Sequence, residues 1–185
     1  MRNVQWMKAG LYAVLLFSAG RSFADGAPTR TARAPAAPPA DRAFLVRALG
    51  VNQTEIVLGQ LALKRGTTAE VRAMGEKMVQ RHTELGRQLR ELAQIDPASA
   101  PPALSADQQQ TVAQLAAVSA PDFDVSFKNT VGAGHVEELA MYRQAARQAA
   151  DPRLGALATR RVAALEQSLA SADQASKVPV AKSDW

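Results

Sequence analysis

The stretch that decides the fold is residues 41–94, DRAFLVRALGVNQTEIVLGQLALKRGTTAEVRAMGEKMVQRHTELGRQLRELAQ. It is rich in Ala, Leu, Gln, Arg and Glu, which favour helix, and its apolar residues recur at helical spacing. We predict one long helix over 41–65 and a second over 67–94. Because only Gly66 separates the two helices, they are expected to be antiparallel neighbours.

Helix ends are also marked in the sequence. Asp41 is suited to be the N-cap of the first helix, because its carboxylate can accept from free backbone N–H groups there. Thr67 and Glu70 are spaced as a capping box for the second helix, and Ser105 and Gln108 are spaced as another. These signals place the starts of three predicted helices.

The second half of the chain repeats this pattern. We predict a short helix over 105–119 and long helices over 121–149 and 151–176. Asp151 followed by Pro152 is the preferred N-cap and first-position pair. The last two helices are again joined tightly and are expected to be antiparallel neighbours.

The connection over residues 95–120 is long and carries the short helix. A helix of about 25 residues spans about 37 Å, and a connection of this length can cross that distance. The prediction is an all-α fold, a ferritin-like four-helix bundle with a long crossover that carries a short extra helix. A plain up-down bundle with the middle segment packed on one side is the alternative.

The N-terminus has the features of a signal peptide over residues 1–24. Arg2 and Lys8 precede a short apolar core, and small residues lead to a cleavage position after Ala24. The apolar core is shorter than the roughly 20 residues of a membrane-spanning helix. We therefore expect a periplasmic or secreted protein with no membrane span after cleavage. Retention of this segment as an N-terminal anchor is the alternative.

Composition divides the remaining chain into three parts. Residues 25–40 are rich in Pro and Ala and are predicted to be a disordered linker. Residues 41–176 form the predicted helical bundle domain, and residues 177–185 are predicted to be a disordered tail.

Charge and cysteine content exclude several classes of function. The net charge is +5, but Arg2, Lys8 and Arg21 belong to the predicted leader, which leaves +2 for the rest. No run of Lys and Arg is interleaved with aromatic residues, so we expect no nucleic-acid binding. The chain has no Cys, which excludes disulfides, thiolate metal sites and thiol nucleophiles.

Four polar residues fall inside the apolar stripes of the predicted helices. Glu55 lies in the stripe of the first helix with Asn52 beside it, His82 in that of the second, and His135 and Glu138 in that of the third long helix. Each lies near the middle of its helix, so the four side chains could meet in one interior layer. Carboxylates and imidazoles that converge in a bundle core are how such folds build metal sites.

Two interpretations of this layer remain open. Glu55, His82, His135 and Glu138 are candidate metal ligands, which suit a mononuclear site. The di-metal pattern needs a Glu-x-x-His pair on each of two helices, and it is absent here. Alternatively, the carboxylates form a salt-bridged core, for which Arg161 on the last helix is the candidate partner. The cofactor hypotheses are therefore one divalent metal ion or none.

Three segments resemble a known family: residues 43–85, 105–116 and 122–158. MVQRHTEL (78–85) and GHVEEL (134–139) are its more specific motifs. They are similar to the bacterial domain of unknown function 4142 family. The resemblance implies a ferritin-like, exported protein without an assigned biochemical role.

The resemblance also implies that Glu55, His82, His135 and Glu138 match the polar motif positions of the family. The chain departs from the family pattern at two positions. Arg81 stands where the family usually has Asp, and Ser168 stands where it usually has His.

Three functional hypotheses follow. The first is a non-enzymatic envelope or stress-related protein that binds an unidentified protein partner or none. The second is a metal-binding bundle that uses the four candidate ligands. The third is a hydrolase with His82 or His135 as base, and it ranks last because no activated nucleophile is spaced to serve it. No phosphate-binding loop, nucleophile elbow or HExxH motif is present.

Overall fold

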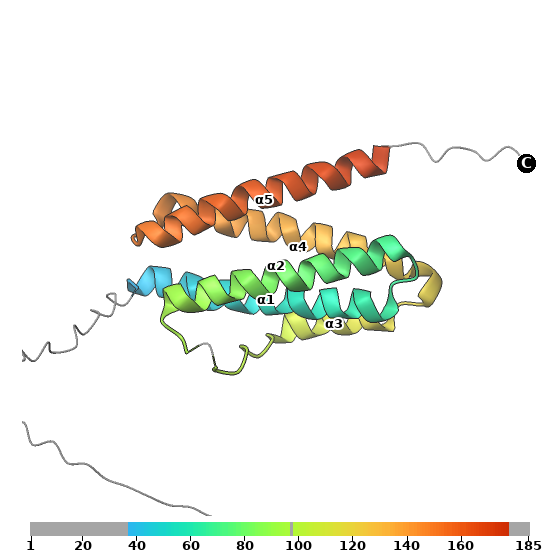
Figure 1. Ribbon diagram of the computed structural model, residues 1–185, viewed down its shortest axis with the longest axis horizontal. Coiled ribbons are helices and arrows are strands. Elements are labelled where there is room, and N and C mark those ends of the chain that lie inside the picture. Colours follow the sequence, from blue (N-terminus) through green and yellow to red (C-terminus); the bar gives the residue numbers. More distant parts are fainter. Residues whose placement is uncertain (1–36, 97, 178–185) are drawn as a thin grey trace, which may run out of the picture. The chain divides into compact units, whose positions relative to one another are not determined.

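The computed structural model describes residues 37–96 and 98–177, with side chains described through residue 174. Over these residues all regular structure is helical, which confirms the all-α prediction (Figure 1). The helices are α1 (Pro39–Arg65), α2 (Ala69–Ala93), α3 (Ala106–Ala117), α4 (Ala120–Gln148) and α5 (Pro152–Lys177). Among the described residues, no helix is both long enough and apolar enough to span a membrane.

The helices are arranged as two antiparallel pairs. α1 packs on α2, and α4 packs on α5. The connection between α2 and α4 runs back along α1 and carries α3, so that α2 and α4 run in the same direction (Figure 1). α3 packs on α1 and α4. The predicted order of two hairpins joined by a crossing connection with a short helix is therefore what the structure shows.

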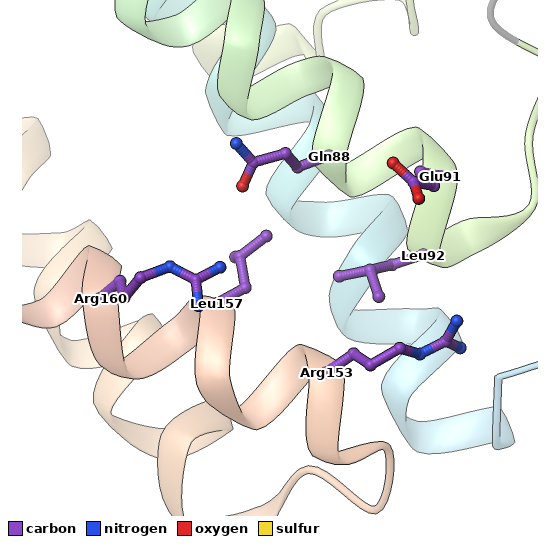
Figure 2. A pocket seen from close by; sticks show the side chains of 6 residues that line it. All are labelled: Gln88, Glu91, Leu92, Arg153, Leu157 and Arg160. Carbon is purple, nitrogen blue, oxygen red and sulfur yellow. The ribbon is translucent and has the colours of Figure 1, made fainter.

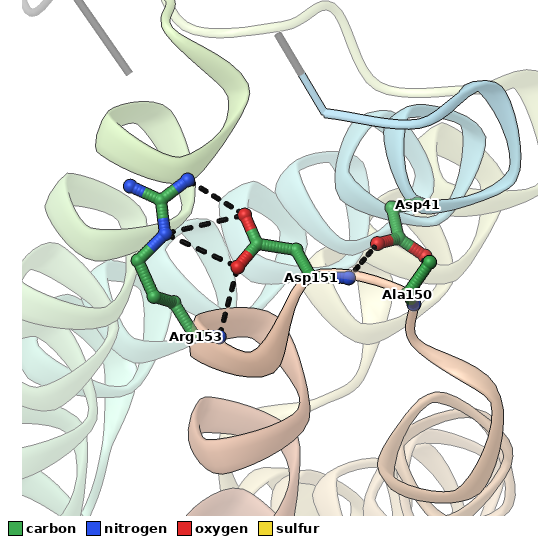
Figure 3. A network of polar contacts seen from close by, with 4 residues as sticks. All are labelled: Asp41, Ala150, Asp151 and Arg153. Carbon is green, nitrogen blue, oxygen red and sulfur yellow. Dashed lines mark hydrogen bonds and ion pairs between the residues drawn. The ribbon is translucent and has the colours of Figure 1, made fainter. Parts of the chain in front are cut away.

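The predicted N-cap role of Asp41 is wrong. α1 begins two residues earlier, at Pro39, within the segment predicted to be linker, because Pro is tolerated in the first turn of a helix. Asp41 is buried, and its carboxylate accepts from the backbone N–H groups of Ala150 at 3.2 Å and Asp151 at 2.7 Å (Figure 3). It therefore accepts hydrogen bonds from the backbone of the turn between α4 and α5, about 110 positions away in sequence.

The start of α2 also differs from the prediction. Its N-cap is Thr68, whose hydroxyl accepts from the N–H of Val71, and not Thr67. Glu70 instead receives a bond from Lys128 Nζ at 2.9 Å. The hydroxyls of Thr67 and Thr68 both donate to the carboxylate of Asp124 on α4. A contact with α4 thus replaces the local capping box, because Asp124 supplies a charged acceptor for both threonines.

The other two helix-start predictions are confirmed. Ser105 and Gln108 form the reciprocal capping box of α3. α5 begins at Pro152, and the carboxylate of Asp151 accepts from the N–H of Arg153 (Figure 3). Gly66 ends α1 as predicted but without a left-handed backbone, since its φ is −54°. Its role is close packing, because an added Cβ would lie 2.7 Å from the carbonyl oxygen of Ala62.

The interior consists of two apolar clusters. One is built from α1, α2, α4 and α5 and includes Leu45, Leu89, Tyr142 and Leu154. The other is built from α1, α2, α3 and α4, and its residues are Leu58, Ala62, Val71, Met78, Leu115, Phe123, Phe127 and Val131. α5 therefore completes the core at one end of the domain, and α3 completes it at the other.

The predicted domain boundaries are only partly covered by the described residues. The predicted leader, residues 1–24, lies outside them, as do most of the linker 25–40 and most of the tail 177–185. α5 continues one residue beyond the predicted end of the bundle, to Lys177.

Candidate metal centre

Three side chains from three helices meet at the level between the two apolar clusters. Glu55 comes from α1, His82 from α2 and His135 from α4. One ligand-type atom of each, a carboxylate oxygen or a ring nitrogen, lies within 4.8 Å of the other two. Glu55 and His82 are each 3% exposed, and His135 is half-buried. The structure thus brings three of the four candidate ligands together.

The tautomer of His82 follows from its neighbours. The side-chain amide of Asn52 donates from Nδ2 to the backbone carbonyl oxygen of His82 at 2.9 Å. Its Oδ1 therefore faces His82 Nδ1, 3.0 Å away. Since an amide oxygen can only accept, Nδ1 carries the proton and Nε2 holds the free lone pair. Asn52 thus orients the imidazole with Nε2 available as a ligand.

Two glycines make room for this arrangement. A Cβ added at Gly86 would lie 2.8 Å from Asn52 Nδ2, so only glycine lets Asn52 reach the backbone of α2. A Cβ added at Gly134 would lie 3.1 Å from Glu55 Oε1. Gly134 therefore allows the carboxylate from α1 to approach the backbone of α4 beside His135.

His135 is held from the other side by α5. Ser168 Oγ lies 3.2 Å from His135 Nδ1, within hydrogen-bonding distance. A serine hydroxyl can donate or accept, so it suits either tautomer of the ring. When Nδ1–H donates to Ser168, the lone pair of His135 is on Nε2, as it is for His82.

Glu138 is not part of the three-residue cluster. Both of its carboxylate oxygens accept from Arg161, from Nε at 2.9 Å and from Nη2 at 2.6 Å. The Glu138 side chain is 1% exposed and that of Arg161 is 14% exposed, so this is a buried, bidentate ion pair. Arg161 Nη2 also lies 3.4 Å from His82 Nε2. Arg161 is the partner that the sequence predicted for a core carboxylate, and it links that carboxylate to the imidazole.

Burial sets the protonation states of the cluster. Burial, and after it the Glu138 carboxylate, raises the pKa of Glu55 to about 8 against the opposing effect of the Arg161 guanidinium. Burial and, to a smaller extent, the Arg161 guanidinium lower the pKa of His82 to about 3 and that of His135 to about 4. At neutral pH both imidazoles are therefore neutral, and the Glu55 carboxyl holds a proton that a cation could displace.

Two buried oxygen atoms lack a hydrogen-bond partner within the described part of the chain. They are Glu55 Oε2 and the hydroxyl of Tyr142. A buried polar atom left unsatisfied costs about 1–3 kcal/mol. Tyr142 lies one helical turn beyond Glu138 on α4, and burial raises the pKa of its hydroxyl. The unsatisfied oxygen of Glu55 lies at the cluster itself and can coordinate a cation once the carboxyl has lost its proton.

A separate cavity of about 280 Å³ lies between α2 and α5 (Figure 2). Leu92 and Leu157 face each other across it, and it is also lined by Gln88, Glu91, Arg153 and Arg160. It shares no lining residue with the three-residue cluster. Its charged side chains are of both signs, so it favours no particular class of ligand.

Comparison with known proteins gives one match. The family described as Domain of unknown function (DUF4142) matches residues 26–175. The chain belongs to this family. No curated protein and no solved structure matches the chain.

The two departures from the DUF4142 pattern have different structural settings. Arg81 is exposed on α2, next to His82 in sequence. Ser168, on α5, faces the cluster directly through its contact with His135. The position where the resemblance implies a histidine is therefore adjacent to the candidate metal centre in this DUF4142 protein.

Sequence reasoning missed the roles of Asn52 and Ser168. The sequence shows Asn52 only as a neighbour of Glu55 in the apolar stripe of the first helix. The signal that could have indicated its role is Gly86, a glycine inside a helix one turn after His82.

Proposed function

We propose that this DUF4142 protein binds one divalent transition-metal ion through Glu55, His82 and His135. The observation that supports this most directly is the convergence of their ligand atoms within 4.8 Å in the domain interior. A carboxylate whose Oε2 has no partner among the described residues is the natural third ligand to two neutral imidazoles. Of the sequence hypotheses, this geometry favours the metal-binding bundle over the interaction protein.

The ligand set favours a particular class of ion. Two imidazole nitrogens and one carboxylate oxygen suit zinc, iron(II), nickel or copper better than magnesium or calcium, which prefer oxygen ligands. Bonds of about 2.0–2.2 Å place tetrahedral ligand atoms about 3.4 Å apart. Since the ligand atoms lie within 4.8 Å of one another, metal binding would draw the three side chains inward by at most about 1 Å. Three protein ligands leave a position for water or another small ligand.

Zinc binding to the purified, chelator-treated full chain is the first test. We expect one zinc ion per chain by isothermal titration calorimetry. At free zinc about 100-fold above Kd the melting temperature should rise by about 5–10 °C. His82→Leu should abolish both effects, whereas Glu137→Gln, at an exposed position on α4, should leave both unchanged. The proposal would be contradicted if the wild type does not bind zinc, or if His82→Leu binds it as tightly as the wild type does. The hypothesis of a non-enzymatic interaction protein would then be favoured.

We further propose that the protein is exported as an envelope or secreted bundle. The support is the basic start, short apolar core and small residues of positions 1–24. Expression of the full chain in a bacterial host, followed by intact-mass measurement of the periplasmic fraction, should give a product that begins at Asp25. Recovery of only the full-length chain in the membrane fraction would indicate a retained anchor.

A further inference from the structure

The hydrogen bond between Arg161 and His82 has a consequence for metal binding. Arg161 Nη2 lies 3.4 Å from His82 Nε2, the ring nitrogen that holds the free lone pair. A guanidinium can only donate, so it occupies the same lone pair that a metal ion would use. The two cannot share that lone pair.

We propose that Arg161 is a built-in competitor for the metal, which lowers the affinity of the site for every divalent ion. This inference rests on the proposed metal function and deepens it. In the metal-free protein the guanidinium holds His82. On metal binding it gives up His82 Nε2 and keeps its two bonds to Glu138.

Glu138 makes this exchange feasible. Its bidentate contact with Arg161, at 2.9 and 2.6 Å, is shorter than the contact of Arg161 with His82. The guanidinium therefore stays anchored and neutralised when the weaker contact is lost.

The competition raises the intrinsic affinity that an ion needs in order to bind at a given concentration. The free-energy cost of displacing Arg161 from His82 is the same for every divalent ion. Ions with strong affinity for imidazole, such as zinc and copper, can exceed it. Manganese(II), at the weak end of the affinity order, should then bind too weakly to be detected.

The test compares zinc affinity in the full chain and in the double variant Arg161→Met/Glu138→Leu. This variant removes the guanidinium and also removes Glu138, so that tighter binding cannot come from a new carboxylate ligand. Replacing both members of a buried ion pair by apolar residues of similar volume is commonly tolerated. We expect Kd for zinc to fall by about 10-fold or more, the scale on which groups around the ligands act. Manganese(II) binding, followed by electron paramagnetic resonance, should appear only in the double variant.

The structure supplies a matched control. Arg143 on α4 and Glu166 on α5 form an ion pair at 2.6 Å between the same two helices, but both side chains are about half exposed. Arg143→Met/Glu166→Leu should leave both affinities unchanged. Arg161→Lys is a second, milder variant. It retains a charge for Glu138 but has no Nη2 to reach His82, so it should also bind zinc more tightly.

The outcomes separate the two proposals. Zinc binding that depends on His82 in the wild type, but is equal or weaker in Arg161→Lys and in the folded double variant, would overturn the competitor role and leave the metal function standing. Tighter binding in these variants but not in the control would support it. If no variant binds zinc in a His82-dependent way, both proposals fail.

Discussion

Glu138→Ala is expected to destabilise the protein by about 3–5 kcal/mol. The substitution leaves the Arg161 guanidinium buried without its bidentate partner, since the Glu138 side chain is 1% exposed and supplies both acceptors. Urea unfolding in the presence of a chelator measures the loss.

Glu166→Ala is the matched control for this measurement. It breaks the ion pair with Arg143, which joins the same two helices but has side chains about half exposed. An exposed pair contributes about 1 kcal/mol or less, so the control should lose little stability. Equal losses in the two variants would show that Glu138 and Arg161 do not form a buried pair.

The second large effect is a change in stability with pH that Glu55→Gln should remove. Burial, followed by the Glu138 carboxylate, raises the pKa of Glu55 from 4.5 to about 8 in the folded protein. The folded state therefore binds more protons than the unfolded state between these values. The stability associated with the neutral carboxyl is complete below pH 4.5 and is lost as the pH rises to 8, at about 1–2 kcal/mol per pH unit.

The difference in unfolding free energy between the wild type and Glu55→Gln isolates this effect. His82 and His135 have lowered pKa values, so they contribute the opposite trend, a gain in stability as the pH rises to 6.5. They are present in both proteins, and their contribution cancels. In the presence of a chelator, the unfolding free energy of the wild type should fall by several kcal/mol relative to that of Glu55→Gln between pH 5 and pH 8. Glu137→Gln should follow the wild type. A difference that does not vary with pH would mean that Glu55 is not buried as a neutral acid.

Helical periodicity was sufficient to predict most of the fold. The four long helices, the short helix in the connection and the shared depth of Glu55, His82 and His135 all follow from period, length and helix midpoint. The errors arose where a long-range contact replaced a local one. Asp41 binds the turn at residues 150–151, and Glu70 binds Lys128. Local capping rules contain no information about such partners.

The candidate centre was less predictable than the fold. Glu55 and Glu138 are alike in sequence, since both are glutamates in an apolar stripe. They differ because Arg161 of α5 reaches Glu138 with two bonds, whereas Glu55 Oε2 has no partner among the described residues. That distinction depends on the rotation of α5 about its own axis relative to α4. A periodic pattern does not define this rotation precisely enough to say which single side chain faces Arg161. The role of Ser168 depends on the same rotation.

The position of the polar layer between two apolar clusters also fixes how the helices align. A slide of one helix by one turn, about 5.4 Å, would move Glu138 or His82 from its partners into leucine, phenylalanine or methionine neighbours. Each such shift would bury a charged side chain or a hydrogen-bonding ring among apolar side chains without a partner, which costs free energy. The polar layer thus specifies the register of the four long helices and disfavours registers that are shifted by one turn.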